Sequence, residues 1–125
     1  MIEEYFHTID TLLAKSPSVR ECDVHFDKRS LSKGYLRGNV IFQDDSLLHF
    51  REFVSIGAEV ERMVYAYHYQ RADSALIFRY DNTPHYPDLP NAPHHRHDSS
   101  GKASGVPAPD LEFVLQEIEL LIGTE

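Results

Sequence analysis

Five strand-like runs joined by very short turns constrain the fold of this chain more than any other feature of its sequence. Taken together, the runs are rich in β-branched and aromatic residues, and turn-forming residues separate them. Connections this short cannot carry the chain back across a sheet, so consecutive strands must run antiparallel. We therefore predict a five-stranded antiparallel meander sheet. Its strands are expected at residues 20–28, 34–43, 46–56, 60–70 and 75–81.

Two amphipathic helices are expected on either side of these strands in the sequence. Residues 2–14 and 110–122 both carry apolar side chains at helical spacing along one face. Ser16-Pro17 ends the first segment, and Pro109-Asp110 marks the start of the second. We expect both helices to cover one face of the sheet, which makes the fold α+β.

The composition fits a single domain of the cell interior, over residues 1–125. Cys22 is the only cysteine, which excludes an internal disulfide and a CxxC motif and suits a reducing cytoplasm. No apolar run approaches the roughly 20 residues that a membrane span needs, so a cytoplasmic protein without a membrane partner is expected. The formal net charge of −8 argues against a dedicated nucleic-acid scaffold, although residues 28–37 contain four cations and no acid.

Residues 82–108 show no periodicity and are expected to form a His/Pro-rich loop within the domain. Such a long connection is usually functional or disordered. The prolines at 84, 87, 90 and 93 recur every third residue, which favours polyproline II with three residues per turn. His85 and His94 would then share one ridge of that helix.

The turns allow a prediction of what the middle strands present on each face. If Gly57-Ala58 and Ala72-Asp73 are two-residue turns, Arg51 lies opposite Val64 and Ala66 lies opposite Arg79. Because side chains alternate along a strand, one face then gathers basic, imidazole and carboxylate groups around small residues. The members of this set are His49, Arg51, His68, Arg79 and Asp81.

Such a face could bind and cleave a phosphodiester. Arginine offers a planar fork of donors to phosphate oxygens, and histidine titrates near neutrality, so one imidazole can accept a proton while another donates one. This chemistry cleaves RNA without a metal when the 2′-hydroxyl is the nucleophile. The candidate catalytic residues are His49, Arg51, His68 and Arg79 from the sheet and His85, His94, His95 and His97 from the loop. The cations expected to steer the RNA backbone are Lys28, Arg29, Lys33 and Arg37.

Each of these residues also has a purely structural interpretation. Arg51 could pair with Asp81, and His49 could be a solvated strand residue. His68 lies in a run with three tyrosines and could be a hydrogen-bonded structural histidine.

A divalent metal is the second chemistry that the loop permits. Imidazole and carboxylate ligands suit zinc and other divalent ions. However, the His-His-x-His spacing matches no strict structural zinc pattern and no cysteines assist, so no metal or other cofactor is favoured. The candidate ligands are His85, His94, His95, His97 and Asp81, with Asp88 as a second carboxylate.

Six stretches of the sequence carry a resemblance to a known family. They are Phe26-Asp27-Lys28-Arg29-Ser30, Gly34-Tyr35-Leu36-Arg37-Gly38, Leu48-His49-Phe50-Arg51-Glu52-Phe53, Tyr65-Ala66-Tyr67-His68-Tyr69-Gln70, Ile77-Phe78-Arg79-Tyr80-Asp81-Asn82 and the proline-spaced stretch from Pro84 to His97. Together they resemble the TumE-like toxin family of bacterial and archaeal toxin–antitoxin pairs, over nearly the whole chain. Tyr86 is a departure, since a second histidine after Pro84-His85 is common in the family.

The resemblance implies a toxin of a type II pair with a cognate antitoxin as its protein partner, and ribonuclease activity is the usual expectation for such toxins. The first hypothesis is therefore a metal-independent endoribonuclease that acts on RNA, with the antitoxin covering the basic face. A homodimer is left open. The alternative is a non-catalytic protein- or metal-binding module that uses the His/Pro-rich loop.

Overall fold

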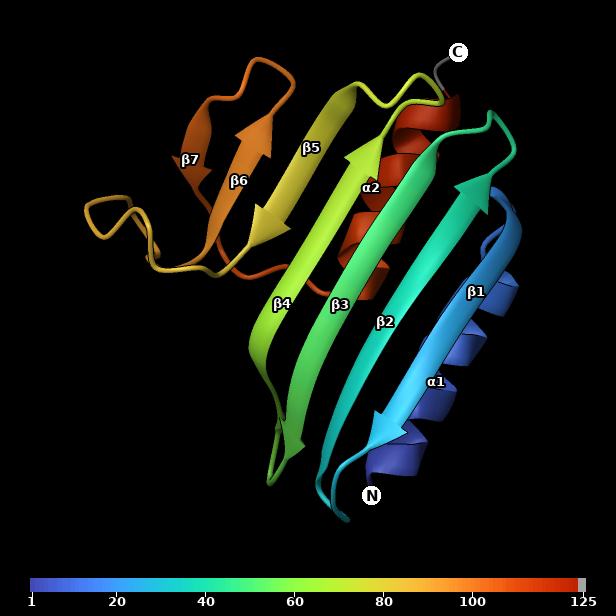
Figure 1. The fold of residues 1–125 in the computed structure, drawn as a ribbon, viewed down its shortest axis with the longest axis vertical. Coiled ribbons are helices and arrows are strands. Elements are labelled where there is room, and N and C mark those ends of the chain that lie inside the picture. Colours follow the sequence, from blue (N-terminus) through green and yellow to red (C-terminus); the bar gives the residue numbers. More distant parts are fainter. Residues whose placement is uncertain (124–125) are drawn as a thin grey trace.

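The computed structural model describes residues 1–123, which form an antiparallel sheet of seven strands with two helices on one face (Figure 1). The strands lie in the sheet in chain order, so the topology is a meander. The elements are α1 (Ile2–Lys15), β1 (Val19–Lys28), β2 (Lys33–Phe42), β3 (Leu47–Ile56), β4 (Val60–Gln70), β5 (Leu76–Asp81), β6 (His95–Asp98), β7 (Ala103–Gly105) and α2 (Leu111–Gly123).

The α+β class, the meander and the placement of both helices on one face are confirmed. The prediction of five strands is wrong, because residues 82–108 contribute β6 and β7 to the same sheet. Both added strands are short, β6 is polar and β7 consists of small residues, so they lack the apolar alternation that identified the others. They extend the sheet beyond β5 through backbone pairing, and the side chains of His95 and Asp81 also join β6 to β5.

The polyproline interpretation of the loop is also wrong. Residues 84–93 form a succession of bends and turns, with Leu89 N donating to Tyr86 O at 3.2 Å and Ala92 N donating to Leu89 O at 3.3 Å. A polyproline helix has no internal hydrogen bonds, so these contacts exclude it. His85 and His94 consequently share no ridge.

The hydrophobic core lies between the helices and the covered face of the sheet. Alternate residues of the central strands point into it, as the two-residue period of a strand requires. The largest fully buried side chains include Tyr65, Tyr67, Tyr69, Phe42 and Phe78, and the helices add Ile2, Ile9, Leu111 and Ile118. The tyrosines are therefore core residues of the covered face.

The register of the middle strands differs from the predicted one by two residues. Ile56 pairs with Val60, so the β3–β4 loop is one residue longer than expected, and a bulge at Phe53/Val54 shifts the pairing by one more. Arg51 therefore lies opposite Ala66 rather than Val64, and His49 lies opposite His68. A bulge in the β4–β5 hairpin has a similar effect, and His68 lies opposite Arg79. Because the side-chain period is two, these even shifts left every candidate residue of the predicted strands on its predicted face.

One carboxyl group lies inside the core. Glu52 is fully buried, and Tyr5 of α1 and Tyr67 of β4 both donate their hydroxyl hydrogen bonds to its oxygens. Burial raises the pKa of Glu52 above its ordinary value, and the two tyrosine hydrogen bonds only partly oppose this. Glu52 thus joins α1 to the sheet through its contact with Tyr5, but its burial makes ionisation of its carboxyl group unfavourable.

This burial predicts the pH dependence of stability. An acid whose pKa is raised on folding stabilises the fold fully below its unfolded pKa, and that stability is lost as the pH rises through the folded pKa. In Glu52→Gln the side chain has a similar shape but cannot ionise, so the free energy of unfolding should no longer fall for this reason as the pH rises. The variant should therefore become more stable than the natural protein as the pH rises. Urea unfolding across a pH series measures the effect. Glu61→Gln, at an exposed position of β4, is the control, and equal pH profiles for both variants would contradict the explanation.

Candidate functional site

Two neighbouring rows of side chains cross the open face of the sheet, the face without helices. Residues in each row are direct ladder partners on adjacent strands. The first row contains Asp23, Asn39, His49, His68, Arg79 and His97. The second row contains His25, Arg37, Arg51, Ala66, Asp81 and His95. The two rows are separated by two residues along every strand, so they share one face.

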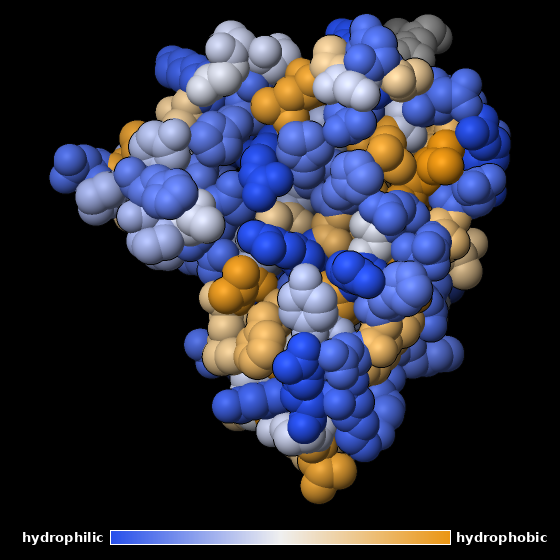
Figure 2. Space-filling view, viewed as in Figure 1, coloured by the Kyte–Doolittle hydropathy of each residue, from blue (hydrophilic) through white to orange (hydrophobic). Residues whose placement is uncertain are grey.

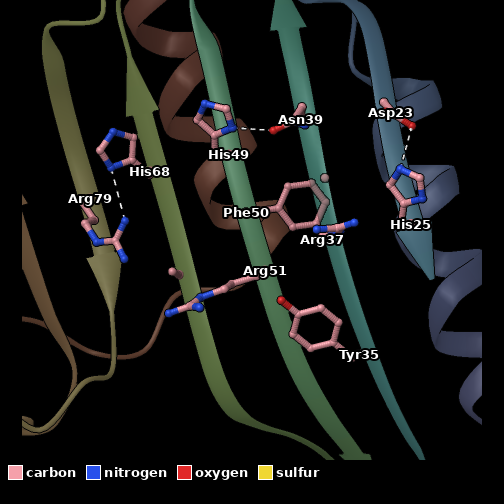
Figure 3. A pocket seen from close by; sticks show the side chains of 12 residues that line it. Asp23, His25, Tyr35, Arg37, Asn39, His49, Phe50, Arg51, His68 and Arg79 are labelled. Carbon is pink, nitrogen blue, oxygen red and sulfur yellow. Dashed lines mark hydrogen bonds and ion pairs between the residues drawn. The ribbon is translucent and has the colours of Figure 1, made fainter. Parts of the chain in front are cut away.

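A pocket of about 610 Å³ lies where the two rows cross β1 to β5. Space-filling representation shows this open face as largely hydrophilic (Figure 2). The close view shows imidazole and guanidinium groups around a low floor (Figure 3). The floor is low because Ala66 is small, and the ring of Phe50 lies directly under the backbone of Gly38 on the covered face. A Cβ at Gly38 would meet that ring at 2.5 Å, so the strand needs glycine here.

His49 has a defined hydrogen-bonding state. Its Nδ1 contacts the side-chain oxygen of Asn39 (Figure 3). A carbonyl oxygen only accepts, so Nδ1 must carry the proton. In the neutral form of this exposed ring, Nε2 then has a free lone pair, the arrangement that a general base requires.

His68 has the complementary state. Arg79 Nη1 lies 3.3 Å from His68 Nδ1, and because a guanidinium only donates, Nδ1 is the acceptor and Nε2 carries the proton. Partial burial, followed by the positive charge of Arg79 and the neighbouring His49, lowers the pKa of His68. The ring centroids of His49 and His68 are 6.3 Å apart. One imidazole thus offers a lone pair, and its neutral neighbour offers an N–H.

The arginines of the pocket are arranged unfavourably for the free protein. Arg37 and Arg51 are direct cross-strand partners, and like charges in that position repel each other. Within residues 1–123, neither guanidinium forms an ion pair with a carboxylate. Arg79, the third guanidinium, donates from Nε to Asp81 at 2.9 Å but also faces the pocket. An anion bound between these groups would relieve the repulsion.

Strands β5 and β6, beside the pocket, hold a buried acid–imidazole pair. Asp81 and His95 are both buried, and Asp81 Oδ1 lies 2.9 Å from His95 Nε2. Burial disfavours ionisation of Asp81, but hydrogen bonds from Thr83 and Arg79 and the nearby His95 outweigh it and lower the pKa of Asp81. Asp81 is therefore paired with Arg79 and His95 rather than with Arg51.

The late histidines divide between three places. His97 is the ladder partner of Arg79 and extends the first row, whereas His95 belongs to the buried pair. His94 lies on the covered face, where its ring stacks on Tyr65 with centroids 5.8 Å apart and its Nδ1 is 2.8 Å from the tyrosine hydroxyl. His85 is exposed in the loop. The structure therefore brings His95 and His97 to the open face and leaves His85 and His94 outside it.

Only one of the four expected RNA-steering cations lines the pocket. Arg37 does, while Lys28 is 2.7 Å from Glu3 and Arg29 is 2.9 Å from Asp27 at the β1–β2 hairpin. Lys33 is exposed at the start of β2, two residues before the pocket residue Tyr35. Neighbouring acids, which the run of cations in the sequence did not reveal, neutralise half of the predicted set.

Several further pocket residues were not predicted from the sequence, and besides Asp23 three of them carry polar side chains that could take part in binding. They are His25, Tyr35 and Asn39. His25 Nε2 lies 3.5 Å from Asp23 Oδ1 on the same strand. The signal for His25 was its alternation with Asp23 and Asp27, since all three point to the same face of β1.

The comparisons with known proteins place the chain in a family. A family model described as "Toxin TumE" matches residues 9–122. No curated protein and no solved structure matches the chain. Neither helix formed by residues 1–123 is long and apolar enough to cross a membrane.

Proposed function

The chain belongs to the TumE toxin family, and on this premise we propose that it is the toxin of a type II pair that cleaves RNA on the open face of its sheet. The main support for the proposal is that Arg37 and Arg51 lie opposite each other without a carboxylate partner. Beside them are two histidines, of which one offers a lone pair and the other an N–H. Guanidinium groups bind the phosphate, and the imidazoles supply proton transfer.

In the proposed reaction, the 2′-hydroxyl of RNA attacks the adjacent phosphorus while His49 Nε2 removes its proton. Arg51 and Arg79 neutralise the negative charge that develops on the phosphorane, and His68 donates its Nε2–H to a non-bridging oxygen. The bond to the 5′-oxygen breaks, and His25 in its imidazolium form protonates that oxygen. The products are a 2′,3′-cyclic phosphate and a 5′-hydroxyl end, and no metal ion takes part.

The proposal accommodates the acidic character of the whole chain. The formal net charge is −8, yet Arg37, Arg51 and Arg79 face a single pocket. RNA binding is therefore confined to this face. We further propose that the cognate antitoxin neutralises the toxin by covering the same pocket.

Cleavage of labelled RNA by the purified chain in EDTA tests the proposal. His68→Ala and Arg79→Ala should each lower the rate by about 10²–10³-fold, the usual effect of removing one donor to a developing oxyanion. His7→Ala, at an exposed position of α1 on the other side of the sheet, should cleave at the natural rate.

Two outcomes would contradict the metal-independent nuclease. Cleavage that requires an added divalent ion would indicate a metal-dependent enzyme. A folded protein that binds RNA or a protein partner but cleaves nothing would favour the non-catalytic module. Growth arrest on induction, relieved by the antitoxin, would support the toxin assignment in either case.

A further inference from the structure

We propose that Asp81, His95 and His97 form a binding site for one divalent transition-metal ion, such as zinc, between strands β5 and β6. One ligand atom from each of these residues can be chosen so that all lie within 4.8 Å of one another. Asp81 and His95 are ladder partners, and His97 follows two residues later on the same face of β6. This inference is independent of the nuclease proposal, which requires no metal.

The hydrogen bonds of His95 require a proton or a cation between its ring and Asp81. His95 Nδ1 lies 2.9 Å from the backbone oxygen of Pro93, which only accepts, so Nδ1 carries a proton. In the neutral ring, Nε2 then presents a lone pair to Asp81 Oδ1 at 2.9 Å. Two acceptors this close repel each other unless a cation lies between them. Either a second proton on the ring or a metal ion satisfies that requirement.

The surroundings of His95 favour the metal. A ligating histidine commonly donates its other ring N–H to a backbone carbonyl, which orients Nε2 toward the ion, as Pro93 does here. The carboxylate is held in the same way, since Thr83 donates to Asp81 Oδ1 from its backbone and its hydroxyl at 3.0 and 2.6 Å. Arg79 contacts the other oxygen of Asp81. The first ligands are therefore pre-oriented by a second layer of contacts.

His97 supplies both the third ligand and the route of entry. Its ring centroid is 4.9 Å from that of His95, and unlike His95 it is partly exposed. The ring of Tyr86 packs edge-on against both histidines, at 4.9 Å from His95 and 5.7 Å from His97. A proton alone would need only His95 and Asp81. The third nitrogen makes a three-ligand site whose remaining positions can hold water.

The donor set indicates the class of ion. Two imidazoles and one carboxylate suit zinc and other divalent first-row transition metals, whereas calcium and magnesium prefer oxygen ligands. Such an ion would join β5 to β6 at the β6 end of both rows, next to Arg79. We therefore expect metal binding to stabilise the fold and to hold Arg79 in place, without entering the proposed cleavage reaction.

Titration of chelator-treated, full-length protein with zinc chloride tests the site. Calorimetry should show one zinc ion per chain. The thermal midpoint should rise by roughly 10 °C at a hundredfold excess over the dissociation constant. His97→Ala should weaken binding by more than the roughly 10–100-fold that loss of an outer-layer partner costs. Because His97 is partly exposed, this variant should remain folded, which circular dichroism checks.

Matched histidine variants distinguish this site from others. His85→Ala and His68→Ala should bind zinc as the natural protein does, because neither residue belongs to the cluster. Asp81→Asn provides a second test, since it removes the charged ligand while keeping its shape. No zinc binding by the natural protein, undiminished binding by His97→Ala and Asp81→Asn, or loss of binding in His68→Ala would each overturn the proposal. RNA cleavage in EDTA is measured separately, so failure of one proposal leaves the other intact.

Discussion

His49→Ala is expected to lower the rate of RNA cleavage by about 10²–10⁴-fold, the contribution of a positioned general base. The physical reason is the contact between Nδ1 and Asn39, which leaves Nε2 as the free proton acceptor. The loss should appear in kcat rather than in KM, because Arg37, Arg51 and Arg79 remain to bind the phosphate. Single-turnover kinetics on labelled RNA measures the change.

Added imidazole should restore part of the activity of His49→Ala, because a small base can occupy the space that the side chain leaves. The exposed position of His49 means that the thermal midpoint should change little, and His7→Ala again serves as the control. A loss confined to KM, or a folded variant with the natural kcat, would show that His49 is not the base.

Phe78→Ala is expected to lower the free energy of unfolding by about 3–5 kcal/mol. Phe78 is fully buried on the covered face of β5, with Tyr69 and Tyr80 at ring-centroid distances of 5.2 and 5.3 Å. Arg96 lies over its ring at 5.2 Å. The substitution therefore leaves a cavity beneath the strand that positions Arg79. Urea unfolding monitored by circular dichroism measures the loss.

Phe113→Ala is the matched control for Phe78→Ala. Phe113 lies on α2 and is 52% exposed, so its truncation should cost less than about 1 kcal/mol. Similar losses for both variants would mean that Phe78 does not anchor β5. A loss for Phe78→Ala of several kcal/mol would be a large fraction of the roughly 5–15 kcal/mol that typically stabilises a domain.

The candidate site was predictable because strand alternation tolerates errors in register. Both hairpins were misjudged by two residues, yet His49, Arg51, His68 and Arg79 lie on the predicted face. Had only one of the two shifts in the β3–β4 hairpin occurred, part of this set would have moved to the covered face. The faces of the strands were therefore more predictable than their partners.

The β6–β7 extension and the environment of the cations could not be predicted. The four residues of β6, His95–Asp98, are all polar, so nothing in their pattern indicates a strand. Lys28 and Arg29 resemble an RNA-binding cluster in the sequence, but Glu3 and Asp27 lie against them in the fold. Charge in a sequence segment does not reveal which opposite charges the rest of the chain brings close.

The sequence by itself determined the two helices, the antiparallel order of the first five strands and the face on which each side chain lies. These properties depend on local periodicity and on turns too short for any other connection. Only the tertiary structure decided which residues meet: Arg37 with Arg51, His68 with Arg79, and Asp81 with His95. Cross-strand partners depend on loop lengths and bulges, which change the register without changing the alternation that the sequence displays.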